Sequence, residues 1–236
     1  MPGEIVLELA AASGDTGFLA ATLLGPGGRL ISSDFVPEMV ESARRHAAEL
    51  GVGNADFRVL DAQELELGDA SVDGVLCRWG YMLMPDPAAA LAETCRVLRP
   101  GGRVAFAVWG SAEENPWGSA PSRVLLRRQL VEQPQPDAPG PFRLQDPERL
   151  RTLVAGAGLE LVRLEDVGVT WRYASSDEHW QAANDLSYTL ASTLARLDRT
   201  EEAAVRAEVA KVLAAYAEGD GLAIPGVSRV VLARRP

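Results

Sequence analysis

The sequence predicts an α/β fold, with a mainly parallel sheet of about seven strands and helices on both faces. Short apolar runs alternate with segments of helical periodicity over the first 110 residues. Strands and helices that alternate in this way are joined by right-handed crossovers, which build a parallel sheet between two layers of helices. The chain has 236 residues, 47% hydrophobic and 24% charged, so it can bury a core without disulfides or metal.

Five short apolar runs are the predicted strands of this core. They are residues 4–9 (EIVLEL), 29–33 (RLISS), 55–60 (ADFRVL), 71–77 (SVDGVLC) and 103–109 (RVAFAVW). Helices are expected between them, one after Gly17, one from Pro37 to the stop signal at Gly51, and one after Asp86. Asp86 precedes a proline, which is typical of a capping residue followed by the first helical position.

The alternation changes after residue 110. Residues 111–145 contain six of the fifteen prolines, which favours a mobile lid, with a short helix expected over 122–131. A helix after Asp146, a strand over 159–169, two longer helices and a closing strand over 228–233 should follow. One of the longer helices should carry leucines at helical spacing, Leu186, Leu190, Leu194 and Leu197. The other should start at Thr200. We therefore predict one domain, with a core over 1–110, a lid-like insertion over 111–145 and C-terminal helices and strands over 146–236.

The charge and the rare residue types exclude several classes of function. A net charge of −10 disfavours binding to nucleic acid or to an anionic membrane. Two cysteines and two histidines make a metal site of the zinc type improbable, so we expect none. The chain shows neither a signal peptide nor an apolar run of membrane-spanning length, so the expected location is the cytoplasm.

Three loops at the carboxyl ends of the predicted strands carry the binding signals, because ligands of open parallel sheets bind there. The first, from Glu8 to Gly17, is rich in small residues that let a ligand approach the backbone. At the second, Asp34 could accept hydrogen bonds from both hydroxyls of a ribose. At the third, Asp61 and Gln63 could read the amino group of a purine. The first two signals also have structural explanations, a tight turn that binds nothing and an exposed acid near a helix start, and the third signal is weak by itself.

Together these loops resemble the class I S-adenosylmethionine-dependent methyltransferases, in particular the small-molecule enzymes of ubiquinone and menaquinone biosynthesis. The matching segments are VLELAAASGDTG, SSDFVPEMVESAR, VLDAQEL and DGVLCRWGYMLMPDPAAALAETCRVLRPGGRVAFAVW. The resemblance implies a Rossmann-like fold with S-adenosyl-L-methionine as cofactor. The cofactor-binding residues it implies are Glu8, Ala10, Ala12, Gly14, Asp34, Phe35, Met39, Asp61, Ala62, Gln63, Cys77 and Arg78. Ala10 and Ala12 stand where the family usually has glycine, and a methyl group at Ala12 would oppose a positive φ.

Aromatic and methionine side chains after the fourth predicted strand, with others further on, suggest an apolar pocket for the methyl acceptor. The residues are Trp79, Tyr81, Met82, Trp109, Trp117 and Trp180. His179 and Tyr81 are weak candidates for a catalytic base, although each is more often a structural residue. Methyl transfer is an in-line displacement, so alignment can supply much of the rate and a base is needed only for a protonated nucleophile.

The predicted function is methyl transfer from S-adenosylmethionine to oxygen, nitrogen or carbon of a small, rather apolar acceptor. A homodimer is left open. One alternative is an NAD(P)-dependent oxidoreductase, because Ala12, Gly14, Gly17 and Asp34 form an imperfect dinucleotide fingerprint. Short-chain oxidoreductases use a tyrosine that lies four residues before a lysine. This pair is missing here, because the single lysine is Lys211 and the residue four before it is Ala207. A second alternative is a degenerate, non-catalytic methyltransferase-like binding subunit.

Overall fold

The computed structural model describes residues 2–25, 27–135 and 137–236. They form two compact units, which we describe separately. Unit 1 comprises Met1–Trp109, Pro139–Glu165 and Arg229–Pro236, and unit 2 comprises Gly110–Ala138 and Asp166–Ser228. The predicted segments 111–145 and 146–236 do not coincide with these units, because the proline-rich segment divides between them.

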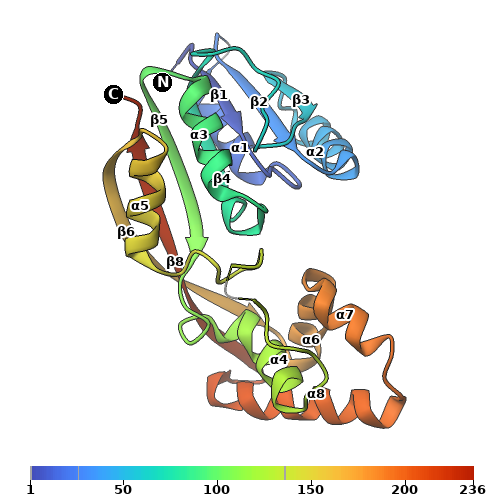
Figure 1. The fold of residues 1–236 in the computed structure, drawn as a ribbon. Helices are drawn as coiled ribbons and strands as arrows, with labels where there is room; N and C mark the ends of the chain where they lie inside the picture. Colours follow the sequence, from blue (N-terminus) through green and yellow to red (C-terminus); the bar gives the residue numbers. More distant parts are fainter. Residues whose placement is uncertain (1, 26, 136) are drawn as a thin grey trace. The chain divides into compact units, whose positions relative to one another are not determined.

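The sheet has the order β3-β2-β1-β4-β5-β8-β6, with the short β7 paired to β8 (Figure 1). Its strands are β1 Ile5–Glu8, β2 Arg29–Asp34, β3 Ala55–Val59, β4 Val72–Arg78, β5 Leu98–Trp109, β6 Glu160–Tyr173, β7 Ala217–Glu218 and β8 Gly221–Arg234. The pairs β1–β2, β2–β3, β1–β4 and β4–β5 are parallel. The predicted α/β fold with a mainly parallel sheet is therefore confirmed.

The helices of unit 1 are α1 Asp15–Leu24, α2 Pro37–Leu50, α3 Pro87–Val97 and α5 Pro147–Gly156. The strand order runs one way from β1 to β3 and the other way from β4 to β5. Right-handed crossovers therefore put α1 and α2 on one face of the sheet and α3 on the other. Val6, Phe18 and Leu30 are buried between the sheet and α1.

Proline-preceding capping residues start α3 and α5, as the sequence predicted. Asp86 accepts hydrogen bonds from the backbone N–H groups of Ala88 and Ala89, and Asp146 accepts one from Glu148. Each carboxylate thereby satisfies N–H groups that have no partner within the helix.

Unit 2 contains α4 Pro116–Arg127, α6 Ser176–Leu186, α7 Tyr188–Leu194 and α8 Arg199–Leu213. Its core is an apolar cluster that includes Val124, Trp180, Leu190 and Val209. Within the described parts of the chain, no helix combines the length and the apolar character needed to cross a membrane.

Two predictions for unit 2 were wrong. The helix expected over 122–131 spans Pro116–Arg127, and Pro116 occupies its first turn as Pro87 does in α3. Unlike Asp86, Asn115 makes no side-chain capping hydrogen bond. The leucines from Leu186 to Leu197 do not lie on one helix. Ser187 ends α6 and its hydroxyl accepts from the Leu190 N–H, which starts α7.

Candidate cofactor site

The strand order reverses between β1 and β4. In open α/β sheets, ligands bind beyond the carboxyl ends of the strands at such a point. Leu7 of β1 pairs with Ile31 of β2 on one side and with Val75 of β4 on the other. The loops after β1, β2 and β4 therefore meet at one edge of unit 1, which is where the sequence placed the cofactor loops.

The loop from Leu9 to Gly14 is held by backbone hydrogen bonds to both neighbouring strands. The Leu9 N–H donates to the Leu76 carbonyl at 2.8 Å, and the Ala11 N–H donates to the Ser33 carbonyl at 2.9 Å. Ala10 and Ala12 both adopt positive φ, 52° and 49°. The loop thus keeps the left-handed turns that glycines usually supply, although an alanine there is strained by its Cβ.

Glu8 ends β1 and lies beneath this loop, 3% exposed. Its carboxylate accepts from the Gly17 N–H at 2.7 Å and from the Ser32 hydroxyl at 3.2 Å. Burial raises the pKa of Glu8 to about 7, against the lowering effect of these hydrogen bonds. A Cβ on Gly17 would lie 2.2 Å from the Glu8 carboxylate, so glycine is required at that position. Glu8 therefore organises the start of α1.

Asp34 ends β2 and links two of the site's loops. One carboxylate oxygen accepts from the Ala12 N–H at 2.9 Å, and the other accepts from the Val36 N–H at 3.0 Å. Each oxygen keeps a second lone pair, so the side chain can still accept from two hydroxyls. Phe35 and Met39 beside it are 69% and 44% exposed. A carboxylate next to bare apolar side chains suits a nucleoside, whose sugar is polar and whose base is flat.

Residues Asp61, Ala62 and Gln63 form a tight turn after β3. Asp61 accepts from the Gln63 backbone N–H at 2.8 Å and from the Gln63 side-chain amide at 3.2 Å. The Gln63 side-chain oxygen accepts from the Asp86 N–H at 2.7 Å, which ties this turn to the start of α3. Gln63 thus holds the turn in place, while Asp61 remains half-exposed.

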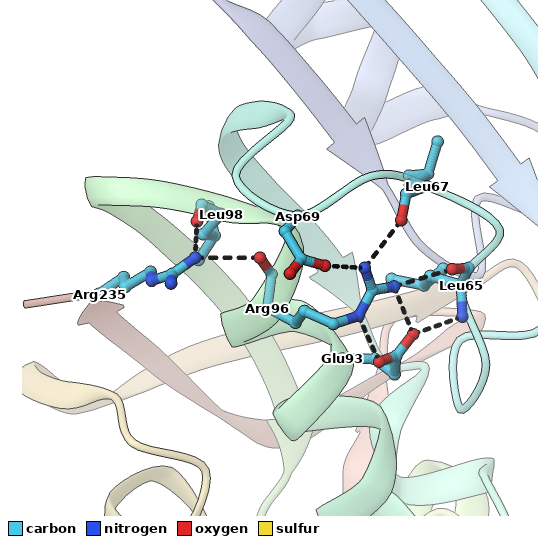
Figure 2. Close-up of polar contacts among 7 residues, drawn as sticks. All are labelled: Leu65, Leu67, Asp69, Glu93, Arg96, Leu98 and Arg235. Atoms are coloured by element: carbon cyan, nitrogen blue, oxygen red, sulfur yellow. Dashed lines mark hydrogen bonds and ion pairs between the residues drawn. The ribbon is translucent and has the colours of Figure 1, made fainter.

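Arg96 of α3 fixes the chain that follows this turn, as Figure 2 shows. Its guanidinium donates to the carbonyls of Leu65 and Leu67 and to the Asp69 carboxylate, at 2.7 to 2.9 Å. Glu93 binds the same guanidinium and also accepts from the Leu65 N–H at 2.7 Å. We call these residues, Leu65, Leu67, Asp69, Glu93 and Arg96, the α3 clamp.

The end of β4 carries a stack of planar side chains. Trp79 packs on Trp109 with ring centres 4.2 Å apart and planes 21° apart, and the Arg78 guanidinium lies 4.7 Å from a Trp79 ring centre. Trp79 has a φ of 60°, a strained value for a bulky residue. Cys77 is buried, and burial raises the pKa of its thiol to about 12, so it stays protonated.

Comparison with known proteins decides the family. Residues 1–136, more than half of the chain, match the family described as a methyltransferase domain. The chain belongs to the methyltransferase domain family. This membership confirms the predicted resemblance and leaves the oxidoreductase alternative without support.

Curated relatives match less than half of this methyltransferase domain. An arsenite methyltransferase of Halobacterium salinarum is 41% identical over 105 residues, which are 44% of this chain and 27% of the relative. Aklanonic acid methyltransferase of a Streptomyces species is 36% identical, over 44% of this chain and 47% of the relative. A ubiquinone/menaquinone biosynthesis C-methyltransferase of Francisella philomiragia is 34% identical, over 43% and 41%. The matched stretch thus spans less than half the length of these relatives.

Solved structures match the fold of the domain over its whole length. A candidate methyltransferase from Bacillus halodurans has a TM-score of 0.66 and 17% identity, with 100% of this chain and 94% of that chain covered. An S-adenosylmethionine-dependent methyltransferase from Aquifex aeolicus has a TM-score of 0.58 and 15% identity, with coverage of 100% and 84%. The Rossmann-like class I methyltransferase fold is therefore confirmed.

The predicted acceptor residues of this methyltransferase domain lie in both units. In unit 1, the half-buried Trp79 stacks on Trp109, and Trp109, Tyr81 and Met82 are all buried. The Tyr81 hydroxyl shares a 2.6 Å hydrogen bond with Thr94, and burial raises its pKa well above the usual value. Tyr81 is thus placed as a core residue of the domain.

The other candidates lie in unit 2. Trp117 packs on Trp171 with ring centres 5.0 Å apart, and Trp180 belongs to the apolar core. His179 is 1% exposed, and its Nε2 lies 2.8 Å from the Trp117 carbonyl oxygen. Among the residues that the structure describes, no group of histidine, cysteine and acidic side chains is arranged to hold a metal ion.

The sequence analysis missed several residues that shape the cofactor loops. The Ser33 hydroxyl donates to the Glu8 carbonyl at 2.7 Å, and the His46 ring binds the Ser13 carbonyl at 3.0 Å. Gly80 is required because a Cβ there would lie 2.6 Å from that of Ala10. A signal existed for Gly80, which lies three residues beyond the end of the predicted fourth strand.

Proposed function

We propose that this methyltransferase domain transfers a methyl group from S-adenosylmethionine to oxygen, nitrogen or carbon of a small, rather apolar acceptor. The observation that carries the proposal is Asp34, a carboxylate at the end of β2 that keeps free lone pairs between a strained loop and two exposed apolar side chains. When bound, S-adenosylmethionine supplies the methyl group from its sulfonium centre.

The residues of unit 1 fit the parts of this cofactor. Asp34 would accept hydrogen bonds from the ribose hydroxyls, and Phe35 with Met39 would cover adenine. Asp61 would accept a hydrogen bond from the adenine amino group. The loop containing Ala10, Ala12 and Gly14 would lie along the methionine portion, with Cys77 and Arg78 on its other side. Glu8 would act beneath the loop through Gly17.

The acceptor is proposed from the character of the methyl-transfer end. The half-buried Trp79 offers flat apolar surface there, with the buried Trp109 stacked behind it and the exposed Arg78 beside it. Relatives named for aklanonic acid and for ubiquinone and menaquinone biosynthesis support a small organic acceptor. The net charge of −10 argues against nucleic acid as the acceptor.

Titration calorimetry with S-adenosylmethionine, its demethylated product and NAD tests the proposal. We expect wild-type protein to bind the first two and not NAD. Asp34→Asn keeps one acceptor oxygen but removes the charge, so its affinity should fall about 10- to 150-fold, the loss of one charge-assisted hydrogen bond of about 1.5–3 kcal/mol. Glu41→Gln, which removes a charge from the exposed face of α2, is the matched control and should bind like wild type.

Two outcomes would contradict these assignments. Equal affinity of Asp34→Asn and wild type would remove Asp34 from the ribose site. If wild type binds neither S-adenosylmethionine nor its product, the non-catalytic alternative takes precedence. Mass spectrometry of purified protein, first for co-purified S-adenosylhomocysteine and then for products that gain one methyl group, separates an active enzyme from a binding subunit.

A further inference from the structure

Unit 2 contains an interhelical pocket that no part of the proposed cofactor site uses. It lies between α6 and α8 and has a volume of about 270 Å³. Its lining, mostly alanines and larger apolar residues, includes His179, Trp180, Val209 and Leu213. Drug-sized ligands occupy pockets of roughly 300–1,000 Å³, so this pocket suits a molecule of one or two rings.

His179 gives this pocket a specific polar group. Its Nε2 lies 2.8 Å from the Trp117 carbonyl oxygen, which can only accept a hydrogen bond, so Nε2 carries the proton. Burial lowers the pKa of His179, although the bond to Trp117 opposes this shift, and the ring is neutral near pH 7. Nδ1 of the neutral ring therefore carries a lone pair.

This lone pair has no hydrogen-bond partner within the described residues. Bulk water does not supply one, because His179 is 1% exposed. The Tyr173 ring packs against the imidazole with ring centres 5.1 Å apart, and contributes no polar group to Nδ1. A buried acceptor without a partner destabilises the fold, and a donor brought by a ligand would remove that cost.

The charges around the pocket restrict what that ligand can be. Asp177 of α6 and Arg206 of α8 both line it, and they form an ion pair with each other at 2.6 Å. Because these two side chains pair with each other, neither is left to pair with a charged ligand. Its remaining surface is mostly apolar, so an uncharged aromatic ring fits it better than a sugar or an amino acid.

We propose that the pocket between α6 and α8 binds a small uncharged aromatic alcohol whose hydroxyl donates a hydrogen bond to His179 Nδ1. Because Nδ1 is buried, the side chains around it must move as the ring enters. The proposal does not rest on methyl transfer, since every residue that carries it lies in unit 2.

The experiment compares 2-naphthol with its methyl ether, 2-methoxynaphthalene, in titrations of the full chain. The two probes share the ring system, and only 2-naphthol can donate. We expect 2-naphthol to bind one-to-one and about tenfold more tightly than the ether, the effect of about 1.4 kcal/mol for one hydrogen bond. Equal affinities, or no binding of 2-naphthol, would overturn the proposal.

Two variants locate the binding. His179→Gln keeps an amide donor for the Trp117 carbonyl but removes the acceptor from the Nδ1 position of the ring. It should lose the discrimination between the probes unless the amide oxygen takes up the same position, which His179→Phe, with no acceptor, excludes. Ala210→Leu should fill the pocket and abolish binding of both probes. Lys211→Gln, which changes an exposed side chain of α8 outside the pocket lining, is the matched control and should bind like wild type. Unchanged binding to Ala210→Leu would show that the probes bind elsewhere, against the proposal.

Nitrogen NMR gives a readout that does not depend on a variant. The chain has two histidines, so protein labelled with ¹⁵N-histidine shows only two imidazole rings. We expect the Nδ1 signal of His179 to be that of an unprotonated nitrogen and to shift when 2-naphthol is added. An Nδ1 that carries the proton, or that does not respond to 2-naphthol, would refute the assignment even if His179→Gln does not fold.

Discussion

Glu8 links folding to pH through its buried carboxyl group. Its pKa is about 7 in the folded chain, against an ordinary value of 4.5, so the folded state binds more protons than the unfolded state between these values. Its contribution to stability is therefore fully present below pH 4.5 and is lost as the pH rises to about 7. The loss is about 3 kcal/mol, since each pKa unit corresponds to about 1.4 kcal/mol.

Glu8→Gln removes this titration while keeping an oxygen for the Gly17 N–H. We expect the variant to gain about 3 kcal/mol relative to wild type when the pH is raised from 5 to 8, as measured by urea unfolding at both values. The difference between the two proteins in free energy of unfolding, taken at each pH, cancels the contributions of the other titrating groups. An equal difference at pH 5 and pH 8 would mean that Glu8 has an ordinary pKa.

Ala12 tests the strain in the first cofactor loop. Its φ of 49° disfavours an L-residue by roughly 1–2 kcal/mol, partly offset by the lower entropy of unfolded alanine. Ala12→Gly should therefore raise the free energy of unfolding by about 0.5–1 kcal/mol, and its affinity for S-adenosylmethionine should be equal to or tighter than that of wild type. Ala11→Gly is the control, since Ala11 lacks positive φ, and it should destabilise the chain. A clear loss of cofactor affinity in Ala12→Gly would show that the methyl group is adapted to its place.

Site residues that end a strand could be predicted, and those held by loop geometry could not. Asp34 was placed correctly at the strand end because the apolar run before it fixes the position. The hydrogen bond of Gln63 to Asp86 joins residues 23 apart and depends on the path of two loops. The two backbone N–H groups that donate to Asp34 could not be predicted either, because they depend on the paths of the loops around it.

At the scale of elements, the α3 clamp should set the position of the predicted adenine loop. Arg96→Gln would leave the Leu65 and Leu67 carbonyls and Asp69 without their donor. We expect a loss of about 1–3 kcal/mol in the free energy of unfolding and weaker S-adenosylmethionine binding at a temperature where the variant is fully folded. Hydrogen exchange should accelerate over residues 61–70.

Arg99→Gln is the matched control for this prediction. Arg99 lies three residues beyond Arg96 and pairs with Asp73 on β4, outside the clamp. Its replacement should leave cofactor affinity unchanged. If Arg96→Gln binds the cofactor like wild type and exchanges no faster over 61–70, the clamp does not position the loop.

Element boundaries were predictable where a local signal fixes them. Asp86 and Asp146, each followed by proline, start helices as expected. The leucines from Leu186 to Leu197 were misassigned because their spacing fits one helix, whereas the Ser187 hydroxyl caps a new one. Leu186 is 71% exposed and Leu190 is 1% exposed, whereas the helical spacing alone would place both on one buried face.

At the scale of the molecule, the proline-rich segment contains parts of different stability. Ala120, Val124 and Leu125 of α4 belong to the core of unit 2. We expect hydrogen exchange in the last two turns of α4 to be as slow as in α8, and fast exchange over residues 131–135 without cofactor. Slow exchange over 131–135 only after S-adenosylmethionine is added would support the predicted lid. Equal protection of α4 and residues 131–135 in both states would contradict it.

The strand order has a consequence for synthesis of the chain. The first five strands of the sheet are complete at Trp109, but β8 lies between β5 and β6 and ends at Arg234. A ribosome that adds about 5–20 residues per second needs roughly 6–25 s to make the 125 residues between these points. During that interval the outer edge of β5 has no partner strand, and such an edge can pair with other chains. The nascent chain is therefore most exposed to aggregation, and most in need of a chaperone, after the cofactor loops have already been made.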